Sequence, residues 1–88
     1  MKKVGWSVYI VKCKDSSLYT GISNNVVKRV RKHNNKLGAV SVRGKLPVRL
    51  VYTELYKDKI DAAKREREIK SWNRKKKLDL IGVRMGLP

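Results

Sequence analysis

The chain has 88 residues, which allows one folded domain with one modest core rather than two. Its 23 lysines and arginines against 7 aspartates and glutamates give a net charge of +16, and a small domain rarely carries such self-repulsion without a polyanionic partner such as nucleic acid. A hydrophobic fraction of 41% argues against disorder, and no apolar run reaches the length of a membrane span.

Two strands joined as a β-hairpin are predicted at residues 6–13 and 18–22, because both runs are rich in β-branched and aromatic side chains. The length of the polar turn between them decides where two tyrosines point. A three-residue loop at 15–17 places Tyr9 and Tyr19 on the same face of the sheet, whereas a loop of two or four residues places them on opposite faces. The sequence does not choose between these loops.

A first helix is predicted to begin after the capping residues 23–25 and to run to about His33. Its apolar face is formed by three valines, Val26, Val27 and Val30. Arg29 and His33 lie four residues apart, so both border this face one helical turn from each other. Because valine is a mediocre helix former, packing must hold this helix.

Residues 34–47 contain two glycines and no helical pattern, and they are predicted as a loop. The alternation of apolar and polar residues then predicts a third strand over 48–56. Asp58 is expected to cap a second helix that continues to about Ser71.

Asn73 is a candidate cap for a third helix, in which Leu78 and Ile81 are expected to pack inward. Residues 82–88 are predicted as a frayed tail. The resulting order is β-β-α-β-α-α, which predicts an α+β fold with a three-stranded mixed or antiparallel sheet and helices packed on it. We expect one domain over residues 1–88, with its core at about 6–81.

The second helix carries one carboxylate, Glu66, beside its buried seam. A single helical stripe contains four residues at spacings of four, three and four, namely Ala62, Glu66, Ile69 and Asn73. Glu68 instead falls on the polar side of the helix. A partly buried carboxylate needs a cation, a metal or hydrogen-bond donors to stay ionised. Three cations are alternatives to a metal as its salt-bridge partner, namely Arg65, Lys70 and Arg29.

These segments together resemble the GIY-YIG nuclease domain, whose two tripeptides lie on successive strands. The tripeptides stand here as SVY at 7–9 and YTG at 19–21. Arg29, ten residues after the second tyrosine, matches the arginine of the family, and His33 matches the histidine of many members. Glu66 matches its metal-binding glutamate.

The resemblance covers about residues 6–81 and is strongest to the small stand-alone, single-domain bacterial branch, the UPF0213-like proteins. Five positions in the right order make a specific signal, although each tripeptide alone is weak. The chain departs from the pattern at Ser7, where the first glycine of the motif is usual. Asn73 is the only candidate for the late asparagine of the family, and a helix cap is the alternative interpretation.

The resemblance implies a one-metal hydrolysis of phosphodiester bonds, with a single Mg²⁺ or Mn²⁺ held by Glu66. In this interpretation Arg29 stabilises the charge of the transition state, and Tyr9 deprotonates the attacking water. Tyr19 positions the water or the scissile phosphate, and His33 assists as an acid–base group or a phosphate contact. A structural motif residue, Gly21, lets the backbone turn closely beside the site.

Several of these residues also have a purely structural interpretation. Tyr9 and Tyr19 are, without the family, ordinary half-buried sheet residues, and His33 at a helix C-terminus complements the helix dipole. Cys13 is the only cysteine, so no disulfide is expected, and its strand spacing predicts a buried structural thiol. Eight polar residues are expected to contact nucleic acid, namely Lys28, Arg31, Lys32, Arg43, Lys70, Asn73, Arg74 and Lys75.

We therefore expect an endonuclease that acts on DNA in preference to RNA, in DNA repair or recombination. The alternatives are a non-catalytic basic module that binds nucleic acid, or a nuclease subunit that takes its specificity from a protein partner. No membrane partner is expected, and the absence of a signal-peptide pattern predicts a cytoplasmic location, associated with the nucleoid if the source is bacterial.

Overall fold

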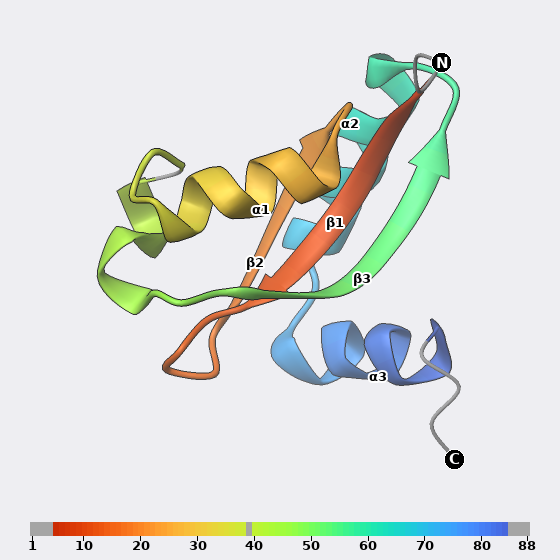
Figure 1. Cartoon of the computed structure of the whole chain (residues 1–88). Coiled ribbons are helices and arrows are strands. Elements are labelled where there is room, and N and C mark those ends of the chain that lie inside the picture. Colours follow the sequence, from red (N-terminus) through yellow and green to blue (C-terminus); the bar gives the residue numbers. More distant parts are fainter. Residues whose placement is uncertain (1–4, 39, 85–88) are drawn as a thin grey trace.

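The computed structural model describes residues 5–38 and 40–84 and contains three strands and three α-helices in the predicted order, with one additional 3-10 helix (Figure 1). The elements in chain order are β1 (Trp6–Lys12), β2 (Leu18–Ser23), α1 (Val26–Asn34), η1 (Val40–Lys45), β3 (Arg49–Tyr56), α2 (Lys59–Lys70) and α3 (Arg74–Arg84). The predicted α+β class and element order are confirmed. None of the helices in the described ranges combines the length and the apolar composition that spanning a bilayer requires.

The three strands form one sheet in the order β2-β1-β3, and both pairings are antiparallel. Of the two sheet types that the sequence allowed, the structure therefore has the antiparallel one. In the β1–β2 ladder Tyr9 lies opposite Gly21 and Val11 lies opposite Tyr19. Because alternate residues share a face, Tyr9 and Tyr19 lie on the same side of the sheet.

The hairpin turn has three residues, but it lies one position earlier than the loop 15–17 considered from the sequence. The Cys13 amide donates to the Ser17 carbonyl at 2.8 Å, which encloses residues 14–16. Ser16 adopts a left-handed conformation with φ of 72°, as is typical of the last residue in three-residue hairpin loops. The Asp15 carboxylate accepts hydrogen bonds from the Ser17 amide and hydroxyl at 2.9 and 2.6 Å, which stabilises the turn in this place.

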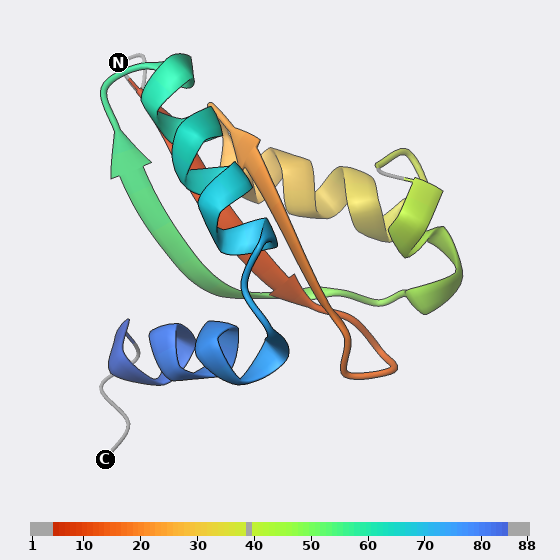
Figure 2. The same cartoon turned by 180° about the vertical axis from the view of Figure 1, so that it is seen from behind.

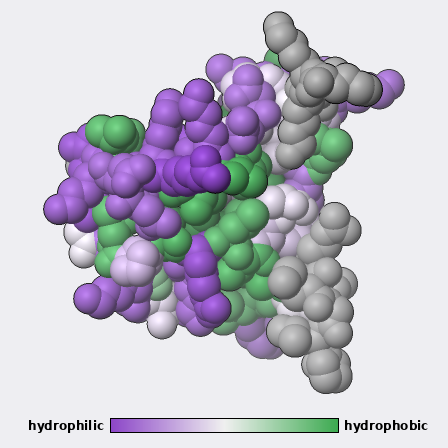
Figure 3. All heavy atoms as spheres, viewed as in Figure 1, coloured by the Kyte–Doolittle hydropathy of each residue, from purple (hydrophilic) through white to green (hydrophobic). Residues whose placement is uncertain are grey.

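Helices cover both faces of the sheet, with α1 on one face and α2 on the other (Figures 1 and 2). The buried cluster on the α1 side comprises Tyr9, Val11, Cys13, Val26, Val42 and Val48. The buried cluster on the α2 side comprises Val8, Ile10, Tyr52, Ala62 and Ile69. The burial of Cys13 confirms the predicted structural thiol. Seen from the α1 side, hydrophilic residues cover α1 and hydrophobic residues show below it in the middle of this face (Figure 3).

Four local predictions were wrong. The predicted loop contains η1, which contributes the buried Val42, and α3 continues through Gly82 to Arg84. Val27 is 59% exposed because it lies one residue, and so about 100° of helix rotation, from the buried Val26. Leu78 is 41% exposed because a hollow remains between it and the sheet, whereas Leu80 and Ile81 pack against the α2-side cluster. Residues 85–88 of the predicted tail lie outside the described residues.

Two polar contacts hold the helices that carry candidate site residues. The Asn34 side chain at the end of α1 donates to the Val48 carbonyl at 3.1 Å and accepts from the Val48 amide at 2.7 Å. On the other face, Arg65 of α2 donates to both oxygens of Glu54 in β3, at 2.9 and 3.0 Å. Burial alone would raise the pKa of Glu54, but this fork and two tyrosine hydroxyls outweigh it and hold that pKa below its usual value.

Candidate active site

Tyr9 lies at the centre of the candidate site, on the middle strand of the sheet. Its side chain is 1% exposed, and its hydroxyl forms a hydrogen bond of 2.8 Å with Nε2 of His33 from α1. The ring centroids of Tyr9, Tyr19 and His33 lie 5.3 to 6.3 Å apart in tilted and edge-on arrangements. The hairpin and the first helix therefore place three of the predicted side chains in one cluster.

Gly21 is required by the position of the Tyr9 ring. A Cβ atom at Gly21 would lie 2.7 Å from the Tyr9 hydroxyl oxygen and 2.8 Å from Cζ, which are closer approaches than real Cβ atoms make. Because Gly21 on β2 has no side chain, the Tyr9 ring of β1 can pack directly against the backbone of β2 at this position. The sequence predicted that Gly21 allows a close backbone turn, but it did not predict this contact with the Tyr9 ring.

We expect Gly21→Ala to displace Tyr9 and to lower the free energy of unfolding by about 1–3 kcal/mol, the usual cost of overpacking a core. Gly44→Ala is the matched control, because a Cβ at Gly44 meets no atom within 4 Å. Urea unfolding of the two variants measures the difference. Equal stability of both variants would contradict the packing that we describe.

His33 is completely buried, and its Nδ1 atom has no hydrogen-bond partner within the described residues. Gly38 packs against the ring so closely that a Cβ atom there would overlap Nδ1. Burial, assisted by the nearby Arg29 guanidinium, lowers the pKa of His33 below its usual 6.5. The imidazole is therefore neutral at neutral pH. In this state Nε2 accepts the Tyr9 hydroxyl proton in one tautomer and donates to the Tyr9 oxygen in the other.

The lowered pKa of His33 predicts a pH dependence of stability. Because the unfolded chain binds a proton near pH 6.5 and the folded chain only at lower pH, the free energy of unfolding should fall as the pH decreases below 6.5, by up to about 1.4 kcal/mol per pH unit. His33 is the only histidine, so His33→Gln should remove this slope. Urea unfolding at pH 7.5, 6.5 and 5.5 measures it, and an unchanged slope in the variant would contradict the assignment.

Arg29 and Glu66 act on the same hydroxyl group. Burial raises the pKa of Tyr9 above its usual 10, the Arg29 guanidinium opposes this by favouring the phenolate, and the charges of Tyr19 and Glu66 add to the increase. The net effect is a raised pKa, so Tyr9 is protonated at neutral pH. The other four predicted catalytic residues thus all lie close enough to act on Tyr9.

Glu66 reaches this cluster from α2, past the edge strand β2. Its side chain is 19% exposed, and it forms an ion pair of 3.1 Å with Lys70, whose ammonium lies 5.9 Å from the centroid of the Tyr19 ring. Glu68 is 56% exposed and pairs with Arg65 at 2.8 Å, as its place on the polar side of the helix predicted. Of the three salt-bridge partners considered for Glu66, the structure has Lys70.

The donor set around Glu66 fits a single hard cation. Within residues 5–38 and 40–84, no cluster of three or more histidine, cysteine, aspartate or glutamate side chains is arranged to hold a metal ion. Among the residues that the structure describes, Glu66 is the only carboxylate that acts on Tyr9. Mg²⁺ needs only one or two carboxylates because it keeps several waters and binds substrate phosphates. Zn²⁺, which is normally held by three or four protein ligands, does not fit this donor set.

The remaining predicted contacts lie on the surface. All eight residues expected to contact nucleic acid are exposed. Lys28 and Lys32 line a small polar hollow of about 140 Å³ together with the candidate catalytic residue Arg29. Asn73 lies outside the tyrosine cluster, and its side chain accepts a hydrogen bond from the Lys76 amide at 2.9 Å, which makes it the cap of α3.

One feature of the site was missed by the sequence argument, and another was only one of several alternatives. The ion pair of Lys70 with Glu66 follows an i, i+4 spacing, and the sequence offered Lys70 as one of three possible partners without selecting it. Gly38 gave no signal, because its contact with His33 depends on how residues 35–38 fold back over the end of α1.

The chain is similar to a known domain family and to several known proteins. The family described as the GIY-YIG catalytic domain matches residues 5–79. The chain is 54% identical over 74 residues to a UPF0213 protein of Staphylococcus saprophyticus, covering 84% of this chain and 90% of that protein. A UPF0213 protein of Clostridium perfringens is also 54% identical over 74 residues, covering 84% of this chain and 80% of that protein.

A solved structure is also similar to this chain. The chain is similar to the solution NMR structure of a UPF0213 protein from Bacillus halodurans, with a TM-score of 0.59 and 40% sequence identity, covering 91% of this chain and 85% of that one. The similarity spans nearly the whole length of both proteins.

Proposed function

The chain belongs to the GIY-YIG catalytic-domain family, in the group of small UPF0213 proteins, and from this premise we propose that it is a divalent-metal-dependent endonuclease that hydrolyses phosphodiester bonds in DNA. The observation that supports the proposal is the grouping of five side chains from four elements around the Tyr9 hydroxyl. Glu66 lies more than thirty residues after Arg29 in the sequence and comes from the helix on the other face of the sheet (Figures 1 and 2).

Glu66 is the residue that would hold one Mg²⁺ or Mn²⁺ ion. When bound, the ion supplies Lewis-acid stabilisation of the phosphate and of the departing oxygen. In the structure the positive charge beside Glu66 comes from Lys70, so Lys70 must turn away or share the carboxylate when the ion binds. Its 50% exposed side chain has room to do so.

Tyr9 is the group that removes a proton from the attacking water. Its raised pKa makes the phenolate rare in the isolated protein, and Arg29 is the residue that favours this charged form. Nε2 of His33 lies 2.8 Å from the Tyr9 hydroxyl oxygen. His33 therefore holds the hydroxyl in one orientation, and Nε2 donates to the phenolate oxygen once the phenolic proton has passed to it.

Arg29 and Tyr19 act on the phosphate. The guanidinium of Arg29 supplies paired donors and a permanent positive charge, which stabilise the additional negative charge of the transition state. Tyr19 is half-buried next to Tyr9 and His33, and its hydroxyl is the candidate group that orients the phosphate or the water.

DNA repair or recombination is the process that we propose for this activity. The exposed basic residues, such as Lys28, Arg31 and Lys32, are suited to phosphate contacts, which fix the register of a duplex without reading its sequence. An enzyme that held DNA through phosphate contacts alone would select substrates by structure rather than by sequence, as nucleases of repair and recombination do.

The experiment that tests the proposal is incubation of the purified protein with supercoiled plasmid DNA in Mg²⁺, Mn²⁺ or EDTA, followed by electrophoresis. We expect nicked product with either metal and none with EDTA, and slower cleavage of an RNA hairpin than of a DNA hairpin. Because Tyr9 titrates above neutrality, the rate should rise with pH from 7 to 9. Salt-sensitive binding without cleavage of either substrate would instead favour the binding module.

A further inference from the structure

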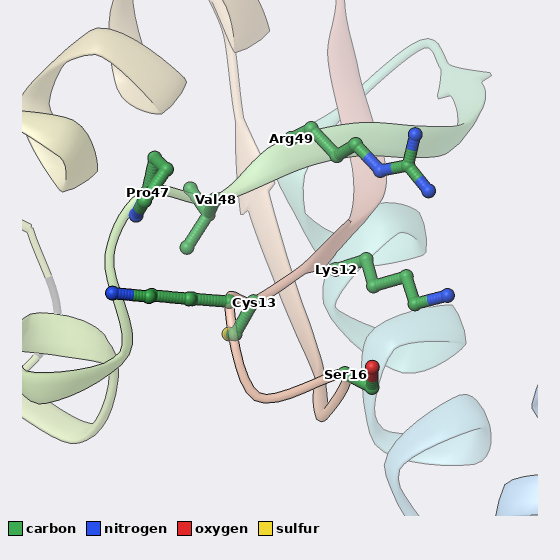
Figure 4. Close-up of a pocket in the computed structure, with 7 residues that line it drawn as sticks. Lys12, Cys13, Ser16, Pro47, Val48 and Arg49 are labelled. Carbon is green, nitrogen blue, oxygen red and sulfur yellow. The ribbon is translucent and has the colours of Figure 1, made fainter.

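A second basic site lies at the hairpin end of the sheet, apart from the candidate active site. A hollow of about 370 Å³ is lined there by Lys12, Cys13, Lys14, Ser16, Pro47, Val48 and Arg49. It has three cations, one hydroxyl and no carboxylate among its lining residues. Figure 4 shows Lys12 and Arg49 extended in the same direction, with the Ser16 hydroxyl directed to the same side.

The placement of Lys12 and Arg49 costs stability. They lie directly opposite each other in the antiparallel β1–β3 ladder, and like charges in this relation destabilise a sheet. On its other side Lys12 faces Leu18, so no cross-strand carboxylate offsets the repulsion. None of the ion pairs formed within residues 5–38 and 40–84 includes Lys12, Lys14 or Arg49.

Asp15, the acidic residue of the adjoining hairpin turn, does not compensate for these charges. The Asp15 carboxylate accepts two hydrogen bonds from Ser17 within the turn and lies 3.9 Å from the Lys45 ammonium. An anion from outside the protein would relieve the repulsion between Lys12 and Arg49. A phosphate fits best, since guanidinium and ammonium groups together with a hydroxyl supply the donors that its oxygens accept.

The two cations also border a second, apolar hollow of about 390 Å³. This hollow is lined by Lys12, Leu18, Arg49, Leu50, Val51, Leu78 and Ile81. Leu50 and Leu78 are each 41% exposed in it, which leaves apolar surface open beside the charged pair. A ligand that matches both hollows has a phosphate and a flat, largely apolar group attached to it. A nucleotide within a nucleic-acid strand has this composition.

We propose that Lys12 and Arg49 bind a phosphate of a single-stranded nucleic acid and that the adjoining apolar hollow receives a base. This inference rests on the proposed function only in taking nucleic acid as the ligand. Lys12 follows Tyr9 by three residues of β1, about 10 Å, and points to the opposite face of the sheet. One nucleotide cannot occupy both places, so this site adds a contact remote from the reacting phosphate.

The first test is an NMR titration of ¹⁵N-labelled protein in EDTA, where no cleavage occurs. We expect a short DNA oligonucleotide to shift the amide signals of Lys12, Ser16 and Arg49 and also those of Leu78 and Ile81. Inorganic phosphate should shift only the first group, and only at much higher concentration. The proposal is overturned if the oligonucleotide leaves these signals unchanged, or if phosphate or a polyglutamate peptide reproduces the complete pattern at equal concentration.

The second test compares two double variants that remove the same charge. We expect Lys12→Gln with Arg49→Gln to weaken oligonucleotide binding about fivefold near 0.1 M salt and to reduce the salt slope by about 0.7, as for one phosphate contact. Lys57→Gln with Lys64→Gln, whose side chains are exposed outside both hollows, should change binding less than twofold. Equally weakened oligonucleotide binding in the two variants would mean that only net charge matters, and it would contradict the proposed phosphate site.

Two further readouts separate this site from the active site and from misfolding. The melting temperature of the Lys12 and Arg49 variant should equal or exceed that of the wild type, because a repulsive pair is removed, and a lower value would overturn the argument. The single-turnover cleavage rate at saturating DNA should stay unchanged. If the wild type proves inactive, the proposed nuclease function fails, while the binding experiments still decide this inference.

Discussion

Glu66→Gln should reduce the single-turnover rate of DNA cleavage by about 10³-fold or more. The reason is that the amide removes the negative charge of the one carboxylate that, among the described residues, acts on Tyr9. Metal-assisted stabilisation of the transition state is worth several kcal/mol, and each 1.4 kcal/mol equals about a factor of ten. DNA affinity in EDTA should change little, because the side chain is not a phosphate contact. Cleavage of a labelled duplex and fluorescence anisotropy measure the two quantities.

Glu68→Gln is the matched control for this variant. Glu68 lies two residues away on the same helix, also forms an ion pair, is 56% exposed, and is not among the charges that act on Tyr9. Its substitution should change the cleavage rate less than about twofold, since exposed ion pairs contribute little. Similar losses in both variants would mean that helix charge, and not a metal ligand, explains the effect.

Tyr9→Phe should lower the cleavage rate by about 10²–10⁴-fold, the range of a general base, with little change in DNA affinity. It should also lower the free energy of unfolding by about 1–3 kcal/mol, because Nε2 of the buried His33 loses its hydrogen-bond partner. Rapid-quench cleavage assays and urea unfolding on the same preparation measure the two effects.

Tyr56→Phe is the control for the loss of a partly buried tyrosine hydroxyl. That hydroxyl donates to Glu54 at 2.7 Å on the α2 side of the sheet, away from the Tyr9 cluster. We expect lower stability in Tyr56→Phe but an unchanged cleavage rate at a temperature where both variants are folded. Full activity of Tyr9→Phe under these conditions would remove Tyr9 from the role of base.

The sequence was sufficient to predict the order of elements and the inward position of Glu66. Both depend on local rules, namely the period of two in strands and the stripe of Ala62, Glu66 and Ile69 along a helix. Asp58 caps its helix as predicted, and of the three candidates at 23–25 it is Asn25 that caps α1, because a cap is a contact between residues three apart.

Local sequence rules did not determine the length of the turn between β1 and β2. The sequence allowed loops of different length and left open whether Tyr9 and Tyr19 share a face. Their common face follows from the observed pairing of Tyr9 with Gly21, which buries the tyrosine against a position without a side chain. Register depends on contacts across the whole ladder, and a shift of one residue would reverse every side chain.

The state of His33 depended on tertiary contacts. At the end of a helix, an exposed histidine that complements the helix dipole was an equally good interpretation. The structure buries the ring between Tyr9, Tyr19 and Gly38, which come from two strands and a loop. The bidentate contact of Arg65 with Glu54, which fixes α2 on the sheet, was not predicted for the same reason.

The most direct test of the one-metal site is the location of the ion itself. Addition of Mn²⁺ to ¹⁵N-labelled protein broadens the NMR signals of nearby amides, so it identifies the residues that hold the ion. We expect signals around Glu66 and Tyr19 to broaden first in the wild type, and this broadening to be lost in Glu66→Gln. Broadening centred on Glu54, Glu68 or Asp61, or a pattern that persists in Glu66→Gln, would contradict the one-metal site.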